Sequence, residues 1–265
     1  MPKHCVSAIV PAFNEEKTVF NVISILQSSS VINEVICVND GSTDSTKEIL
    51  ERFKDNKKVK VINLDKNKGK GNALAVGIKH SKGDILLFID ADLINLTKDH
   101  IYSLLEPLLQ GTHRAVLGYI SGKGNRNIVA DLTGQRAYFK KDLEPYIDEI
   151  SKTRFGVETY LNKLFKAEDT IKVPLHNLKG LFKYEKQRAD IALKEYLKEG
   201  VEIAKVIGNT EIISDEDMKV LQKILNISDI NTLKKYLNKI SNSKIKNSLQ
   251  KYFNQYVDII RKMYP

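Results

Sequence analysis

The sequence predicts an α/β protein with an open, mixed but mostly parallel sheet, helices on both faces of that sheet, and an all-helical C-terminal extension. Through the first 120 residues, strand-like apolar runs alternate with helical stretches at spacings of about 25 residues. Such alternation is typical of parallel βαβ units. Beyond residue 150 the strand signal fades, and helical periodicity with frequent lysine replaces it. A chain of 265 residues can form one large domain, or one domain with an appendage.

The predicted elements follow one another in a regular order. Strands are expected at 6–13, 34–40, 59–65 and 84–92, with helices between them at 15–29, 42–55 and 69–83. A further helix at 98–111 ends at Gly111, and "AVLGYI" (115–120) follows as a strand. Helices are then expected at 154–165, at 179–208 and from Ser214 onward, where Ser214 and Asp217 have the spacing of a capping box.

Composition and charge restrict the class of protein. Hydrophobic residues make up 42% and charged residues 28% of the chain, which is ordinary for a globular protein. No apolar run reaches the length of a membrane-spanning helix, and the N-terminus lacks a secretory pattern, so a cytoplasmic protein is expected. Cys5 and Cys37 are interpreted as small buried hydrophobic residues. The net charge is +9, of which +8 falls in residues 151–265.

The stretch "DILLFIDADL" (84–93) raises the question of function. Five apolar residues predict a buried strand, and Asp90 and Asp92 follow it with one alanine between them. Side chains two apart on an extended backbone share a face, so these two carboxylates are expected to lie close together. Their repulsion is relieved if a cation or hydrogen-bond donors lie beside them. The alternative is a solvated turn, in which Asp is common.

The other strand ends also carry polar, loop-forming groups: "PAFNEE", "VNDGSTDST" and "DKNKGKGNA". Ligands of open parallel sheets bind beyond the carboxyl ends of the strands. Asp40 is placed to accept hydrogen bonds from a base or ribose, and Gly41 lets backbone approach closely. Lys68 and Lys70 flank glycines where a helix begins, a setting that suits phosphate. The spacing matches neither a P-loop nor a Rossmann fingerprint.

Together, "SAIVPAFNEEKTV", "EVICVNDGSTDST", "NKGKGNAL" and "ILLFIDADL" resemble the nucleotide-sugar-binding half of family 2-type glycosyltransferases with the GT-A fold. The resemblance implies a catalytic domain at 1–182, divided into a donor half (1–120) and an acceptor half (121–182). The helical periodicity and frequent lysines of the remaining residues predict a basic helical extension at 183–265. It also implies a UDP-sugar or GDP-sugar donor and a Mg²⁺ or Mn²⁺ ion. The donor-binding residues that it implies are Pro11, Ala12, Asn14, Glu15, Asp40, Gly41, Lys70 and Asp90. Asp92 is the first choice for the metal ligand, with Asp90 reaching ribose or metal.

The second half resembles the acceptor side of the same superfamily. In "DLTGQRAYFKKDL" (131–143), the implied acceptor-binding residues are Gly134, Gln135 and Arg136. Glu158 is the candidate catalytic or acceptor-orienting carboxylate; its alternative is a helix-initial Glu favoured by the helix dipole. His176 is the candidate third metal ligand, and a packed or solvated loop His is its alternative.

Two branches of the superfamily remain open. Glucosyl-phosphoglycerate and mannosylglycerate synthases retain configuration and use a small acceptor, whereas dolichyl-phosphate-type transferases invert it, in which case Glu158 acts as a base. The lysines of "KGLFKYEKQRADIALKEYLKEG" form either a solvated helix face or a surface for anionic lipid, which would bring the enzyme to a lipid-linked acceptor. A non-catalytic protein that binds sugar nucleotides or nucleic acid is the alternative from another class. However, no nucleic-acid-binding module is recognisable, and nucleic acid is not expected as a partner. The sequence does not decide whether the protein forms a homodimer.

Overall fold

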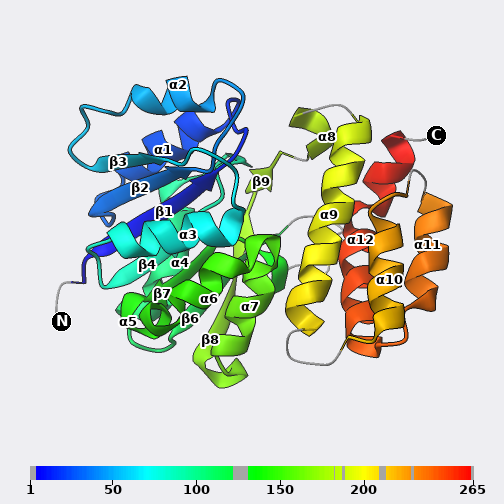
Figure 1. Ribbon diagram of the computed structural model, residues 1–265. Coiled ribbons are helices and arrows are strands. Elements are labelled where there is room, and N and C mark those ends of the chain that lie inside the picture. The colour runs from blue at the N-terminus through cyan, green and yellow to red at the C-terminus, as the bar shows by residue number, and fades with distance from the viewer. Residues whose placement is uncertain are drawn as a thin grey trace. The chain divides into compact units, whose positions relative to one another are not determined.

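The computed structural model describes residues 4–121, 131–181, 183–186, 189–208, 213–227 and 230–263 (Figure 1). The chain forms two compact units. The first comprises Met1–Arg154 and Leu161–Leu181, and the second comprises Phe155–Tyr160 and Phe182–Pro265. Each unit is described below by itself.

A seven-stranded sheet forms the centre of the first unit, in the order β3-β2-β1-β4-β7-β6-β8. Only β7 among these strands runs antiparallel to its neighbours, so the sheet is mixed and mostly parallel, as predicted. The strands are β1 (Val6–Ala12), β2 (Glu34–Asn39), β3 (Val59–Asn63), β4 (Ile85–Phe88), β6 (Ala115–Ser121), β7 (Arg136–Phe139) and β8 (Thr170–His176). A small antiparallel pair, β5 (Leu93–Ile94) and β9 (Lys179–Gly180), stands apart from this sheet.

Helices cover both faces of the sheet, which confirms the predicted α/β fold (Figure 1). The helices of this unit are α1 (Val19–Ser28), α2 (Thr46–Glu51), α3 (Lys70–His80), α4 (Lys98–Leu109), α5 (Lys140–Leu143) and α6 (Ile147–Lys152). Alternate residues of β1 face opposite sides: Ala8 and Val10 join the larger core with α1 and α4, whereas Ile9 meets α3 at Gly77. A Cβ at Gly77 would collide with the Ile9 side chain, so this glycine lets α3 approach the sheet closely.

The start of α4 ties this helix to β8. The Thr97 hydroxyl accepts a hydrogen bond from the His100 backbone N–H at 3.3 Å, and His100 Nδ1 accepts one from the Thr97 N–H at 3.2 Å, which makes a capping box. The other ring nitrogen, Nε2, donates to the carbonyl oxygen of His176 at 2.8 Å. One tautomer, with the proton on Nε2, satisfies both ring contacts. His100 therefore has a structural role.

The second unit is helical, which confirms the predicted C-terminal extension (Figure 1). It contains the N-terminal turn of α7 (Val157–Leu164) and the helices α8 (Lys183–Lys186), α9 (Ala189–Gly208), α10 (Asp215–Ile224), α11 (Ile230–Lys239) and α12 (Ser243–Met263). A Cβ at Gly200 of α9 would stand 2.5 Å from Cζ of Phe253 in α12, so the absence of a side chain at Gly200 allows the Phe253 ring to pack against α9. Across the described residues, no helix is long and apolar enough to cross a membrane.

Asp217 joins α10 to the connection between α11 and α12. The Ser214 hydroxyl caps α10 by accepting from the Asp217 N–H at 3.1 Å. The buried Asp217 carboxylate does not complete a capping box; it accepts from Ser241 N and Oγ at 2.7 and 2.9 Å and from Asn242 N at 3.0 Å. Burial alone raises the pKa of this carboxyl, but the three donors outweigh burial and lower it below its ordinary value.

The sequence left open whether the lysines of this extension are solvated or face lipid, and Lys183 does neither. Its ammonium group lies 2.8 Å from Glu199, 3.4 Å from Glu195 and over the ring of Tyr196. Burial opposes its charge, but the two carboxylates raise the pKa of Lys183 above its ordinary value. Lys183 therefore ties α8 to α9, whereas Lys198 is exposed.

Candidate functional site

The candidate site lies at the carboxyl ends of the parallel strands β1, β2 and β4, where three loops meet. Asn14, after β1, adopts left-handed backbone geometry with φ of 57°. Its side-chain Oδ1 accepts from Thr43 N at 2.8 Å, and its backbone N–H donates to Ser42 Oγ at 3.0 Å. The backbone N–H of Glu15 donates to Thr46 Oγ1 at 2.8 Å. Asn14 and Glu15, both predicted to bind donor, thus fix the first loop against the second.

Two further residues of the predicted donor set lie on β1 itself. Pro11 pairs with Val38 of β2 and is half-buried, and Ala12 pairs with Asn39 and is buried. They lie at the end of the strand from which the first loop departs. Their predicted contact with base and ribose is untested.

Asp40, directly after β2, organises the loop that leads into α3. Its carboxylate accepts hydrogen bonds from the backbone N–H groups of Lys68 at 2.9 Å and Gly69 at 2.7 Å. Burial raises the pKa of Asp40, and these donors and the charge of Arg154 offset only part of that rise. Gly41 has φ of 70°, and a Cβ there would stand 2.7 Å from Asn67 N. The loop after β2 and the loop after β3 therefore pack directly against each other.

Arg154 is a residue of this region that sequence reasoning missed. It has left-handed geometry with φ of 49°, which is uncommon for a residue with a long side chain. A Cβ at Gly69 would stand 2.9 Å from its Cα, so the two backbones touch. The one available signal was a basic residue directly before "FGVE"; its closeness to Asp40 depends on tertiary structure.

Asp90 contacts three other residues of the predicted site. Its Oδ1 lies 2.6 Å from the Lys70 ammonium group, and its Oδ2 accepts from Gln135 Nε2 at 2.9 Å. A Cβ at Gly134 would stand 2.5 Å from Asp90 Cγ. The structure therefore brings together a predicted donor pair and two predicted acceptor residues, and the ammonium group relieves the charge of the carboxylate.

Asp92 lies one residue before β5 and is half-buried. Strand β4 ends at Phe88, so Asp90 and Asp92 lie beyond the strand rather than in it, which corrects the predicted limits of 84–92. The backbone carbonyl of Asp92 accepts from Leu181 N at 2.9 Å, and a Cβ at Gly180 would stand 3.7 Å from its Oδ1. The pair of β5 and β9 thus brings residues 179–181 beside the predicted metal ligand.

His176, the predicted third metal ligand, ends β8 and has an exposed side chain. Among the residues described, no three His, Cys, Asp or Glu side chains gather as a ligand set. The role of His176 as a third metal ligand stays a prediction.

Arg136 lies inside the fold. It is only 1% exposed, and its guanidinium group donates to the carbonyl oxygens of Thr133 at 2.6 Å and Asp131 at 2.8 Å and to Asn162 Oδ1 at 2.7 Å. It also donates to Tyr138 Oη at 3.0 Å. This arrangement favours a structural role over the predicted contact with acceptor.

Glu158 belongs to the second unit, where it lies in the first turn of α7 and is 9% exposed. Gly156, two residues earlier, lies against Val206 of α9, because a Cβ there would collide with that side chain. The catalytic assignment of Glu158 stays a prediction.

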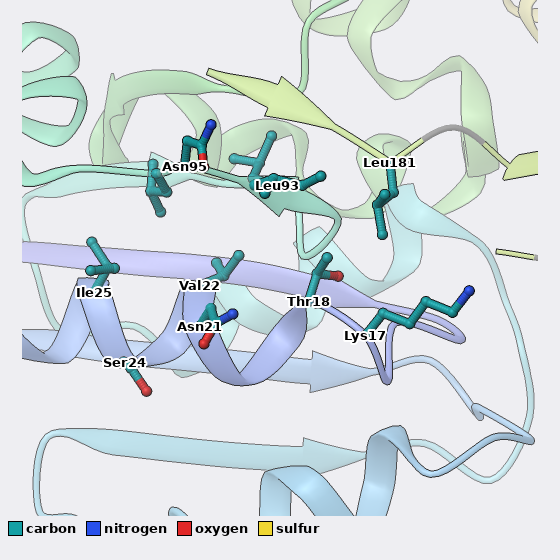
Figure 2. A pocket seen from close by; sticks show the side chains of 11 residues that line it. Lys17, Thr18, Asn21, Val22, Ser24, Ile25, Leu93, Asn95 and Leu181 are labelled. Carbon is teal, nitrogen blue, oxygen red and sulfur yellow. The ribbon is translucent and has the colours of Figure 1, made fainter. Parts of the chain in front are cut away.

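A pocket of about 420 Å³ lies in the first unit between α1 and the segment that follows Asp92 (Figure 2). Polar and apolar side chains of α1 and of the two residues before it line one wall, and residues 93–96 with Leu181 line the other. The lining residues are Lys17, Thr18, Asn21, Val22, Ser24, Ile25, Leu93, Ile94, Asn95, Leu96 and Leu181. None of the predicted site residues is among them, although Leu93 directly follows Asp92. Sequence reasoning missed this pocket because its α1 wall reads as an ordinary amphipathic helix.

The mostly parallel open sheet with helices on both faces is the GT-A arrangement of glycosyltransferases. The sequence profile described as "Glycosyl transferase family 2" matches residues 7–165. The chain therefore belongs to glycosyl transferase family 2, and it is a glycosyltransferase.

Curated relatives match over shorter stretches. An uncharacterized glycosyltransferase of Synechocystis sp. is 37% identical over 92 residues, which is 33% of this chain and 29% of that protein. Poly-beta-1,6-N-acetyl-D-glucosamine synthase of Staphylococcus epidermidis is 38% identical over 90 residues, which is 34% of this chain and 22% of that protein. The chain thus matches less than a third of the length of these relatives.

Solved structures match more of the chain. Glucosyl-3-phosphoglycerate synthase from Mycobacterium tuberculosis gives a TM-score of 0.61 at 22% identity, covering 80% of this chain and 82% of that chain. That structure contains Mn²⁺, uridine diphosphate and glucosyl-3-phosphoglycerate, and a second one contains Mn²⁺, UDP-glucose and phosphoglyceric acid. At this identity the likeness establishes a shared fold.

Proposed function

We propose that this glycosyltransferase moves a hexose from a UDP- or GDP-linked sugar to an acceptor with the help of Mg²⁺ or Mn²⁺. The observation that carries the proposal is the pair Asp90 and Asp92 directly after the central strand β4. The loop held by Asp40 and the N-terminus of α3 lie at the same edge of the sheet. Base, ribose and diphosphate of a donor all need partners there.

The donor atoms of this site fit a hard divalent cation. Carboxylate oxygens are the ligands that Mg²⁺ and Mn²⁺ prefer, and Mg²⁺ is commonly held by one or two carboxylates together with substrate phosphates and water. Asp92 is half-buried, and Gly180 leaves space beside it. Two carboxylates thus suffice, and the role of His176 as a further ligand stays a prediction. When bound, such an ion neutralises charge on the departing diphosphate.

The chain's own residues supply the remaining functions. Asp40 fixes the loop before α3 by accepting from the backbone N–H groups of Lys68 and Gly69. The N–H groups of the first turn of α3 are proposed to bind a donor phosphate. Lys70 adds an ammonium group 2.6 Å from Asp90, placed to interact with a donor phosphate. Glu158 is proposed to orient or deprotonate the acceptor.

The acceptor is proposed to be a small molecule. Support comes from the shared fold with a glucosyl-3-phosphoglycerate synthase whose structures contain glucosyl-3-phosphoglycerate or phosphoglyceric acid. A lipid-linked acceptor is the second candidate, supported only by exposed lysines such as Lys198. Co-sedimentation with anionic vesicles that falls with salt would favour the lipid-linked candidate.

The proposal is tested by transfer or hydrolysis assays with UDP-glucose and GDP-mannose, each with Mn²⁺, Mg²⁺ or EDTA. We expect turnover of one of these donors that depends on the cation and is lost in Asp92→Ala, with Glu158→Gln lowering turnover while leaving donor binding intact. Cation-independent turnover in the Asp92→Ala variant would contradict the metal assignment.

A further inference from the structure

Gln135 lies between Thr133 and Asp90 and is buried, at 3% exposure. Its Nε2 donates to Asp90 Oδ2 at 2.9 Å, and its Oε1 lies 2.7 Å from the Thr133 hydroxyl. Its backbone is also fixed, because the Gln135 carbonyl accepts from Gly118 N at 2.8 Å. A side chain with both amide ends engaged and so little exposed surface is a poor contact for an acceptor.

The orientation of the Gln135 amide follows from its two neighbours. An ionised Asp90 only accepts hydrogen bonds, so the NH₂ end of the amide must face it. The oxygen end then faces Thr133, whose hydroxyl lies within hydrogen-bonding distance of both this oxygen and the Gly118 carbonyl. A reversed amide would place its oxygen against the carboxylate.

The Asp90 carboxylate is held on three sides. Gln135 occupies Oδ2, Lys70 lies 2.6 Å from Oδ1, and the backbone of Gly134 leaves no space for even a methyl group beside it. Lys70 approaches as a cation on a flexible stem, whereas the Gln135 amide is engaged at both ends. The fixed side is the Gln135 side.

We propose that Gln135, held by Thr133, is a positioning residue that sets the orientation of the Asp90 carboxylate for the bound donor and its cation. This assignment replaces the acceptor contact predicted from sequence, and it rests on the proposed function of Asp90. Outer partners of metal-binding side chains typically change metal affinity by about 10–100-fold when they are removed.

The test measures binding of UDP and of GDP in the presence of Mn²⁺ by calorimetry, without acceptor. Gln135→Met, which keeps the shape but lacks the amide, is expected to weaken binding of the preferred nucleotide about tenfold or more. In an Asp90→Ala background the same change is expected to have no further effect, since Gln135 acts through Asp90. Thr133→Ser should bind as wild type does, and Thr133→Val should weaken binding.

Because no acceptor is present, a loss in this assay separates positioning from acceptor binding. Wild-type affinity in Gln135→Met, or an equal loss in the Asp90→Ala background, would overturn the assignment. Thermal unfolding gives a second measurement on the four ligand-free proteins of this double-mutant cycle, which are wild type, Gln135→Met, Asp90→Ala and the double variant. Non-additive shifts in melting temperature are expected for residues in contact, and additive shifts would also overturn it. Failure of wild type to bind either nucleotide, with non-additive melting shifts, would refute the proposed function and leave the contact intact.

Discussion

Replacing Gly134 with alanine probes how tightly the Asp90 carboxylate is held. The new methyl carbon would stand 2.5 Å from Asp90 Cγ, whereas ordinary carbon–carbon contacts are about 3.5–4.0 Å. The carboxylate cannot retreat freely, because Lys70 and Gln135 hold its two oxygens. Gly134 does not have positive φ, so alanine fits its backbone and the effect is one of crowding.

The size of this effect follows from two opposing contributions. Overpacking lowers the free energy of unfolding by about 1–3 kcal/mol. Alanine in place of glycine restores about 0.4–1 kcal/mol by restricting the unfolded chain. The net destabilisation is about 1–2 kcal/mol, which corresponds to a fall in melting temperature of roughly 2–8 °C for a unit of this size.

Thermal unfolding of the ligand-free Gly134→Ala protein measures this fall. In an Asp90→Ala background, where the carboxylate is absent, the same substitution is expected to leave the melting temperature unchanged or raise it. A melting temperature at or above that of wild type in the otherwise unaltered protein would refute the packing argument.

Three further predictions concern other parts of the chain. Asp217→Asn should lower the unfolding free energy of the second unit by about 1.5–3 kcal/mol in urea titrations, with exposed Asp215→Asn as a neutral control. Folding lowers the pKa of Asp217, so the difference in unfolding free energy between wild type and Asp217→Asn should be largest at pH values above the ordinary carboxyl pKa. It should decrease as the pH falls through the pKa of the folded state. A difference that stays constant down to pH 2 would contradict this prediction. Arg154→Gly should be more stable than Arg154→Ala by about 1–2 kcal/mol, since φ at this position is 49°, and equal stabilities would argue against that geometry. Cys37 is buried as predicted, whereas Cys5 is exposed, which corrects the buried position expected for it. A thiol reagent should therefore modify Cys5 in the native protein and Cys37, whose pKa burial raises to about 12, only after unfolding; two reactive thiols in the native state would be the contrary result.

The strands β1, β2 and β4 were predictable because each is buried and carries an apolar run. The strands β7 and β8 were missed for physical reasons. Strand β7 begins with Arg136, whose charge is satisfied by tertiary hydrogen bonds that a sequence pattern does not show. Strand β8 lies at the sheet edge, is half-exposed and contains Pro174, a residue that edge strands tolerate but that weakens a strand prediction.

The site was predictable where topology alone brings residues together. Lys70 follows β3 and Asp90 follows β4, both at the carboxyl ends of parallel strands, and the structure pairs them. The contact of Gln135 with Asp90 depends on how β7 inserts beside β4, and the closeness of Arg154 to Gly69 depends on packing after α6. Neither leaves a periodic signal in the sequence.

The most direct test of the account is calorimetric titration of wild type and Asp92→Asn with UDP and with GDP, each with and without Mn²⁺. The account predicts that Mn²⁺ strengthens binding of one nucleotide to wild type by about tenfold or more, equivalent to about 1.4 kcal/mol, and that Asp92→Asn removes this gain while leaving cation-free binding unchanged. An equal gain from Mn²⁺ in both proteins would contradict the claim that the carboxylates after β4 hold a cation for the donor.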